Sequence, residues 1–238
     1  MGDSLRLLKY RAKQNPLYFL KRPWLMFFLP FWGAQFILGR LKSCTSVVYL
    51  TETSIEELLA KSRARTESLR WRVVRDSAEF AVYARERVEE DRAVGRLYFE
   101  EVDRRFARGD FAVVGFVDDC CPVAYVFICT ARAVFTPVNM TLPLPRATFG
   151  LYDVYTYEKF RGRGYYSSLF DQSVRMMLHR DFEKVWLWLM VHNQGSIRVH
   201  LAIGINLISK ILTEKISFGI IKRTVTDVNI SLDNLISK

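Results

Sequence analysis

A basic turn interrupted by glycine carries the clearest chemical signal in this chain. It reads Arg161-Gly162-Arg163-Gly164. Glycine lacks a Cβ atom, so Gly162 and Gly164 allow unusual dihedral angles and a close approach of a ligand to the backbone. Arginine donates to phosphate through a planar guanidinium. These residue types predict an anion site, although a solvated loop or a nucleic-acid contact would use the same residues.

The turn lies between an expected strand and an expected helix. Residues 152–157 are mostly β-branched or aromatic, which is typical of a strand. Leu169, Val174, Met177 and Leu178 then recur at roughly helical spacing. A strand that enters a helix through such a turn directs backbone N–H groups outward, and together with the helix dipole they attract an anion.

A second strand and a second helix follow. Residues 184–191 form a continuous apolar run typical of a buried strand. This run leads to Asn193-Gln194-Gly195-Ser196 and a short helix-like stretch that ends at Gly204-Ile205. The expected order of helices and strands predicts a mixed α/β (α+β) plan rather than a doubly wound one.

At these two segments the chain resembles the GNAT acetyltransferase superfamily. The family's loop is Gln/Arg-x-x-Gly-x-Gly/Ala, and residues 161–166 match it except at Tyr166, where the family has a small residue. The family's later motif is Asn-x-x-Ala, with Tyr, Gly and Phe following at fixed offsets. At those places this chain has Asn193, Ser196, His200, Gly204 and Ile205. The resemblance is good over residues 110–225 and loose over 45–110.

The resemblance implies a GNAT-like central mixed sheet of six to seven strands flanked by helices. It also implies acetyl transfer from acetyl-CoA to an amine, with no metal. The pantetheine arm would lie between the strands at 152–157 and 184–191, held by the main chain of the first strand and by Asn193, while the glycine turn would hold the pyrophosphate. The implied cofactor-binding residues are Val154, Tyr155, Thr156, Arg161, Gly162, Arg163, Gly164, Tyr165, Tyr166 and Asn193.

Acetyl transfer to an amine needs a base for the ammonium and an acid for the departing thiolate, because the pKa of an alkyl amine lies near about 10. Asp153 is the first choice for the base, and Glu158, at the exit of the strand, is the alternative. His200 stands where many family members have a tyrosine that protonates the departing thiolate. Trp188 stands where some members have a glutamate base, so that version of the mechanism is not expected. Asp153 in an ion pair and His200 hydrogen-bonded to backbone are the competing structural interpretations.

The N-terminal segment holds most of the positive charge. Residues 1–45 carry +7 of the net charge of +10, so a nucleic-acid-binding catalytic domain is not expected. The 17 residues from Pro23 to Gly39 are uncharged and rich in Trp and Phe, but a spanning helix needs about 20. A membrane-interface segment, packing against the domain or a second subunit, and a true span all remain open here. We expect a cytoplasmic protein, peripheral to the inner face of the membrane in the first case.

Between its ends the chain is expected to form one catalytic domain. Residues 1–43 are the basic, apolar extension, 44–228 the GNAT-like domain and 229–238 a polar tail. The first strand is expected at 44–50 or at 69–74, and further strands at 111–117, 123–131, 207–212 and 216–225. One helix is expected at 55–64, and two more within 78–108, separated near Gly95. Residues 137–145 are expected to be a proline-rich loop. Cys44, Cys120, Cys121 and Cys129 lack metal-site spacing and are expected to be reduced thiols.

These expectations favour an acetyl-CoA-dependent N-acyltransferase. Its acceptor would be a small molecule or an amino sugar near the membrane, and it could act as a homodimer. The alternatives are a non-catalytic acyl-CoA-binding or regulatory module with the same fold, and a membrane-anchored structural protein without a cofactor.

Overall fold

The computed structural model describes residues 44–61, 69–90, 95–118, 120–190, 193–205, 207–217 and 220–231. The predicted N-terminal extension, including Pro23–Gly39, therefore lies outside the described residues. No helix within these ranges is long and apolar enough to cross a membrane.

In the part of the chain that the structure describes, one sheet of eight strands organises the fold. Its order is β10-β9-β1-β8-β7-β4-β3-β2, and every neighbouring pair is antiparallel except β7 and β8. The strands are β1 (Cys44–Ser54), β2 (Arg70–Val74), β3 (Phe111–Phe116), β4 (Pro122–Cys129), β7 (Thr148–Thr156), β8 (Lys184–Met190), β9 (Leu207–Ser217) and β10 (Ile220–Ser231). The predicted mixed sheet flanked by helices is confirmed, with one strand more than expected, because the two alternative first strands are both present at different places in it.

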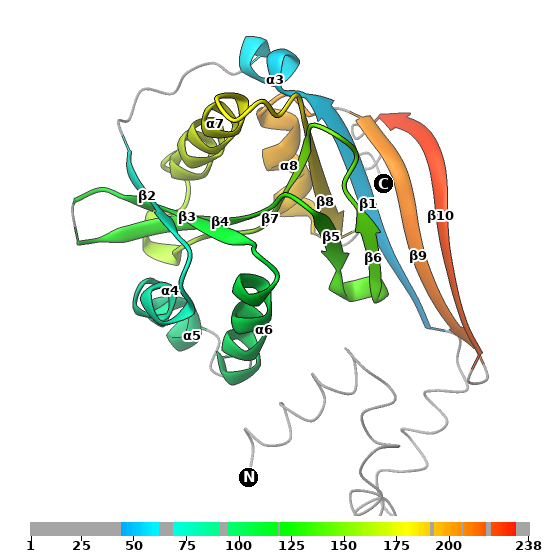
Figure 1. The fold of residues 1–238 in the computed structure, drawn as a ribbon, viewed down its shortest axis with the longest axis horizontal. Helices are drawn as coiled ribbons and strands as arrows, with labels where there is room; N and C mark the ends of the chain where they lie inside the picture. The colour runs from blue at the N-terminus through cyan, green and yellow to red at the C-terminus, as the bar shows by residue number, and fades with distance from the viewer. Residues whose placement is uncertain are drawn as a thin grey trace, which may run out of the picture.

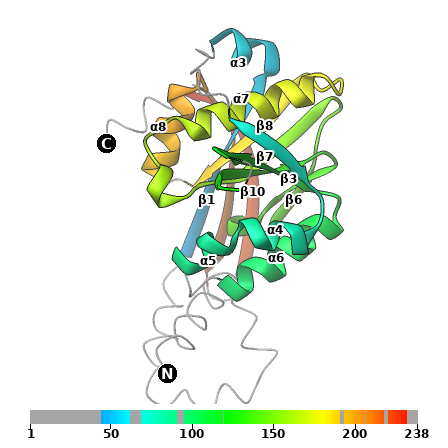
Figure 2. The ribbon, with the colours of Figure 1, turned by 90° about the vertical axis from the view of Figure 1, so that its left-hand side faces the viewer.

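Helices cover both faces of the sheet (Figures 1 and 2). Helix α3 (Ile55–Lys61), α7 (Tyr165–Leu178) and α8 (Gln194–Ala202) lie on one face. Helix α4 (Ser77–Tyr83), α5 (Arg85–Glu90) and α6 (Gly95–Ala107) lie on the other. The predicted pair of helices at 78–108 is thus three, because the chain already turns at Ala84 before α6 begins at Gly95.

Two apolar clusters, one on each face, form the core. Strands β3 and β4 are buried on both faces almost throughout, which agrees with their continuous apolar sequences. The cluster under α3, α7 and α8 includes Leu169, Val174 and Ile197. The opposite cluster, under α4–α6, includes Phe80 and Val102. The gap between strands described below lies in the plane of the sheet, between these two clusters.

The prediction of a proline-rich loop at 137–145 is wrong. Strand β5 (Arg132–Phe135) and strand β6 (Met140–Pro143) form a separate hairpin there, joined by the short 3-10 helix η3 (Thr136–Val138). The prolines are tolerated because Pro137 lies in the first turn of η3 and Pro143 lies at the end of a strand. Ala133, Phe135 and Val138 are buried in the cluster of the α4–α6 face.

The last two strands also run further than expected. Strand β9 continues through Ser217, and β10 continues to Ser231, where Ile230 and Ser231 pair with Ile208 and Leu207. The first residues of the predicted polar tail are therefore part of the sheet.

Candidate active site in the gap between two parallel strands

Strands β7 and β8 pair over only four residues and then separate. Their register runs from Thr148 opposite Lys184 to Leu151 opposite Leu187. Beyond this point the described residues show no pairing between them, although β8 continues to pair with β1 up to Met190. The backbone edge of β7 that faces β8 is therefore open over residues 152–156. An open edge inside a sheet can accept an extended ligand as an additional strand.

A β-bulge lies in β7 beside this opening. Tyr125 of β4 pairs with Tyr155, and Phe127 pairs with Tyr152, so two residues of β7 oppose one residue of β4. Asp153 is one of the two and has φ of +44°, an unusual value for a residue with a side chain. A bulge redirects the backbone at a sheet position next to a site. Here it lies at Asp153–Val154, where the residues predicted to bind the pantetheine arm begin.

The predicted anion turn follows at the end of β7. After the short 3-10 helix η4 (Glu158–Phe160), Gly162 and Gly164 both have positive φ, +77° and +82°. Gly164 is the N-cap of helix α7, and none of the described side chains caps that helix end. The first amides of this 14-residue helix are thus left for a ligand. The Arg161 side chain, by contrast, turns back to the carbonyl of Thr156, 3.1 Å away, and to Glu158.

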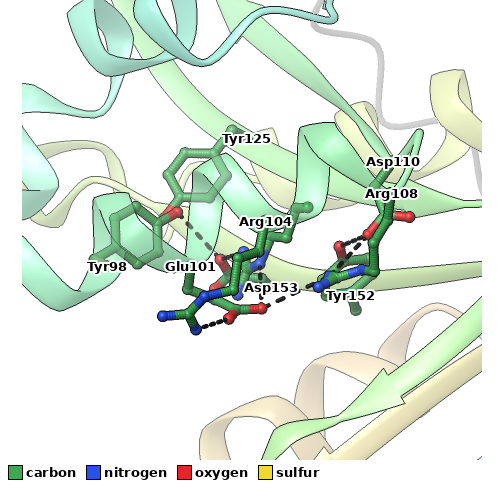
Figure 3. A network of polar contacts seen from close by, with 9 residues as sticks. Tyr98, Glu101, Arg104, Arg108, Asp110, Tyr125, Tyr152 and Asp153 are labelled. Carbon is green, nitrogen blue, oxygen red and sulfur yellow. Dashed lines mark hydrogen bonds and ion pairs between the residues drawn. The ribbon is translucent and has the colours of Figure 1, made fainter. Parts of the chain in front are cut away.

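Asp153 is held by a polar network that descends from helix α6 (Figure 3). Its Oδ2 atom accepts a hydrogen bond from Tyr98, at 3.1 Å, and pairs with Nη1 of Arg105. The Tyr98 hydroxyl also lies 2.6 Å from that of Tyr125. Burial, followed by the charge of Asp153, raises the pKa values of Tyr98 and Tyr125 well above the usual value, so both are neutral donors.

The Arg105 guanidinium stays charged although it is buried. Burial opposes its charge, but the Asp153 carboxylate outweighs that penalty and raises the pKa of Arg105. Its Cζ atom lies 4.7 Å from the centroid of the Phe127 ring and 5.1 Å from that of Tyr152. A cation over aromatic faces gains further stabilisation. Asp153 was predicted as a general base, with an ion pair as the competing structural interpretation; in the structure its carboxylate is in an ion pair with Arg105.

A second polar group lies beside the first. The Tyr152 hydroxyl donates to Oδ2 of buried Asp110 at 2.6 Å, and Arg108 binds the same oxygen at 3.1 Å (Figure 3). Glu101 lies within 3.6 Å of both Arg105 and Arg108. The carboxylates of this region are therefore joined to arginines of α6 and of the turn that follows it.

His200 and Tyr166 lie between helices α7 and α8, with ring centroids 6.3 Å apart. The His200 Nδ1 atom is 2.7 Å from the carbonyl of Ser196, so it carries the proton of the neutral ring. Burial lowers the pKa of His200 to about 4 despite this hydrogen bond, so the imidazole is neutral at pH 7. The geometry of His200 is therefore that of the competing structural interpretation, a histidine hydrogen-bonded to the backbone. The buried Tyr166 hydroxyl has no hydrogen-bond partner among the described residues.

Asn193 caps helix α8 instead of extending freely from the end of β8. Its side-chain oxygen accepts from the amide of Ser196 at 3.0 Å. Val154, Tyr155 and Thr156 lie half-buried along the open part of β7. The Tyr155 ring is covered by two cations, with Cζ of Arg87 at 4.1 Å and Cζ of Arg161 at 5.4 Å from its centroid. The turn and the open strand are thus close to each other, and Arg161 links them.

The sequence analysis did not single out Arg105 and Tyr98, because they lie in a charged run at residues 78–108, and such a run is typical of a solvated helix face. A signal existed: Tyr98, Val102 and Arg105 recur at helical spacing, and Val102 is fully buried. An arginine on the buried side of an amphipathic helix must find a carboxylate. Among the described residues, no group of His, Cys, Asp and Glu side chains could hold a metal ion.

Comparisons with known proteins agree with this geometry. The model of the acetyltransferase (GNAT) family matches residues 56–205. No curated protein matches the chain. A functionally unknown conserved protein from Staphylococcus epidermidis has a similar fold, with a TM-score of 0.51 and 15% identity over 84% of this chain and 68% of its own. A tandem GNAT protein from the clavulanic acid biosynthesis pathway aligns with a TM-score of 0.49 and 11% identity, over 67% of this chain and 50% of its own.

Proposed function

Because this chain belongs to the GNAT acetyltransferase family, we propose that it transfers an acetyl group from acetyl-CoA to the amine of an acceptor molecule. The observation that carries the proposal is the parting of β7 and β8 beside a bulge, with the uncapped N-terminus of α7 at the wide end of the gap. These features together suit an extended ligand with an anionic end.

The described residues fit acetyl-CoA in this position. The open edge of β7 at residues 154–156 would bind the pantetheine arm through the backbone, and the amides of residues 162–166 would bind the pyrophosphate. Bound acetyl-CoA supplies an activated acyl group: its C–S bond breaks, an amide C–N bond forms, and the proton of the amine ends on the thiol. Backbone amides beside the bulge, already fixed in place, would stabilise charge that develops on the carbonyl oxygen.

The two residues predicted for acid–base catalysis would have different roles. Asp153 lies on the open part of β7, and it would act as base by exchanging its contact with Tyr98 or by receiving the proton through water. The neutral His200 would relay a proton, since it is uncharged at pH 7. The acceptor would lie on the face of the sheet covered by α4–α6 and the β5–β6 hairpin.

A second candidate function is a module that binds acyl-CoA without turnover. It is supported by the ion pair of Asp153 with Arg105 and by the neutral state of His200. A calorimetric titration with acetyl-CoA, followed by a search for thiol release with a panel of amines, separates the two. The proposal expects micromolar binding, about −8 kcal/mol, and release that is lost in Asp153→Asn. Binding with no release from any amine favours the module, and a folded protein that does not bind acetyl-CoA contradicts both.

A further inference from the structure

Two aromatic rings lie over the narrow end of the gap, in the apolar cluster on the face covered by α4–α6. Tyr152 and Trp188 are the residues that directly follow the last paired positions, Leu151 and Leu187. Their rings are stacked, with centroids 5.0 Å apart and an interplanar angle of 15°. Tyr152 and Trp188 together are called the aromatic wall below. It stands where the two strands begin to part.

The aromatic wall is fixed from several sides. Phe135 of the β5–β6 hairpin packs on Trp188, with ring centroids 4.9 Å apart. Gly150 leaves room for the indole, since a Cβ atom there would come within 3.1 Å of the Trp188 ring. Tyr152 is 8% exposed, and its hydroxyl is bound to Asp110. Neither ring can therefore turn aside without disturbing a packed neighbour.

We propose that the aromatic wall limits the acyl group of the donor to a short chain, acetyl or propionyl. This inference rests on the proposed function. Val154, the first of the strand residues predicted to bind the pantetheine arm, lies two residues from Tyr152, across the bulge. A longer acyl tail that extends along the gap toward its closed end would meet two packed rings after a few carbon atoms. Interiors packed in this way accept added methylene groups only at the cost of strain.

The test measures binding of CoA and of its acetyl, butyryl and hexanoyl thioesters by calorimetry. The full-length wild-type protein is compared with Trp188→Ala, Trp188→Leu and Trp71→Ala. Trp71 lies on β2, at the far edge of the sheet, and is 41% exposed, so it controls for the loss of a tryptophan. Unfolding curves establish that each variant is folded.

In the wild type we expect hexanoyl-CoA to bind at least about tenfold more weakly than acetyl-CoA, because its tail must displace the wall. In Trp188→Ala the difference should shrink to within about threefold, with Trp188→Leu between the two. Trp71→Ala should keep the wild-type ratio. The affinity for free CoA, which has no acyl group, should be the same in all four proteins.

Equal affinity of the wild type for acetyl-CoA and hexanoyl-CoA would overturn the inference, and this result needs no variant to fold. An unchanged ratio in a folded Trp188→Ala protein would also overturn it. If the wild type binds neither CoA nor any thioester, the proposed function fails and the inference fails with it. If it binds acetyl-CoA without a preference for length, only the inference fails.

Discussion

The Arg105 guanidinium of helix α6 and the Asp153 carboxylate form an ion pair at the bulge of strand β7. The side chains are 11% and 25% exposed. Because Asp153 has φ of +44°, its backbone conformation is unfavourable by itself and must be held by its surroundings. The ion pair supplies that support from a helix distant in sequence, beside the open edge of β7.

Arg105→Met should destabilise the protein by about 3 kcal/mol, because a partly buried carboxylate loses its partner. The free energy of unfolding in urea measures the effect. The double variant Arg105→Met/Asp153→Asn should recover part of the loss, since no charge is left unpaired.

Arg104 provides the matched control for Arg105. Its side chain is 62% exposed and pairs with Glu101 on the helix surface. Arg104→Met should change stability by less than about 1 kcal/mol. Equal losses in the Arg104 and Arg105 variants would show that the pair with Asp153 has no special importance.

His200 should make stability depend on pH below neutrality. Burial lowers its pKa to about 4 from 6.5, so between these values the unfolded chain binds the proton and the folded chain does not. Stability from this group is complete above pH 6.5 and is lost as pH falls; at pH 5 the loss is about 2 kcal/mol. Urea unfolding at pH 5 and pH 8 measures the difference.

His200→Gln should reduce that pH difference by about 2 kcal/mol, because its amide can donate to the Ser196 carbonyl but does not titrate. The exposed His179, at the end of α7, serves as the control through His179→Gln. A His200→Gln protein with the wild-type pH dependence would contradict a neutral, buried imidazole.

Tyr166→Phe should be neutral or stabilise the protein by about 1 kcal/mol, since it removes a buried hydroxyl that lacks a partner among the described residues. Tyr157→Phe is the matched comparison, because the Tyr157 hydroxyl donates to the carbonyl of Tyr83. That variant should be destabilised by about 1 kcal/mol. Thermal or urea unfolding of both variants measures the two changes in stability. A large loss of stability in Tyr166→Phe would mean that the Tyr166 hydroxyl has a hydrogen-bond partner in solution.

Gly162→Val should weaken acetyl-CoA binding by about tenfold or more, because a β-branched residue does not keep a φ of +77° and the turn must rearrange. Gly109→Val is the control. Gly109 has φ of +86°, and a Cβ atom at either glycine would meet no atom of the described residues within 4 Å. Both variants should lose similar stability, and only Gly162→Val should lose affinity in calorimetry. Unchanged binding in Gly162→Val would count against the turn as the pyrophosphate site.

The sequence alone determined the parts of the site that are local. Strand β8, the end of β7, the glycine turn and helices α7 and α8 each follow from residue types within a few positions of one another, so pattern and propensity were sufficient. The family loop could be recognised for the same reason, since Gly162 and Gly164 have the positive φ that only glycine adopts readily.

Only the tertiary structure decided how these parts are held and where the gap ends. Arg105 and Asp153 are 48 residues apart, and Phe135, Tyr152 and Trp188 come from three separate strands. A charged helix residue looks solvated until its burial is known, and two aromatic residues on different strands give no sign in sequence that their rings will stack. Register and packing between distant segments bring them together, and short-range spacing does not encode either one.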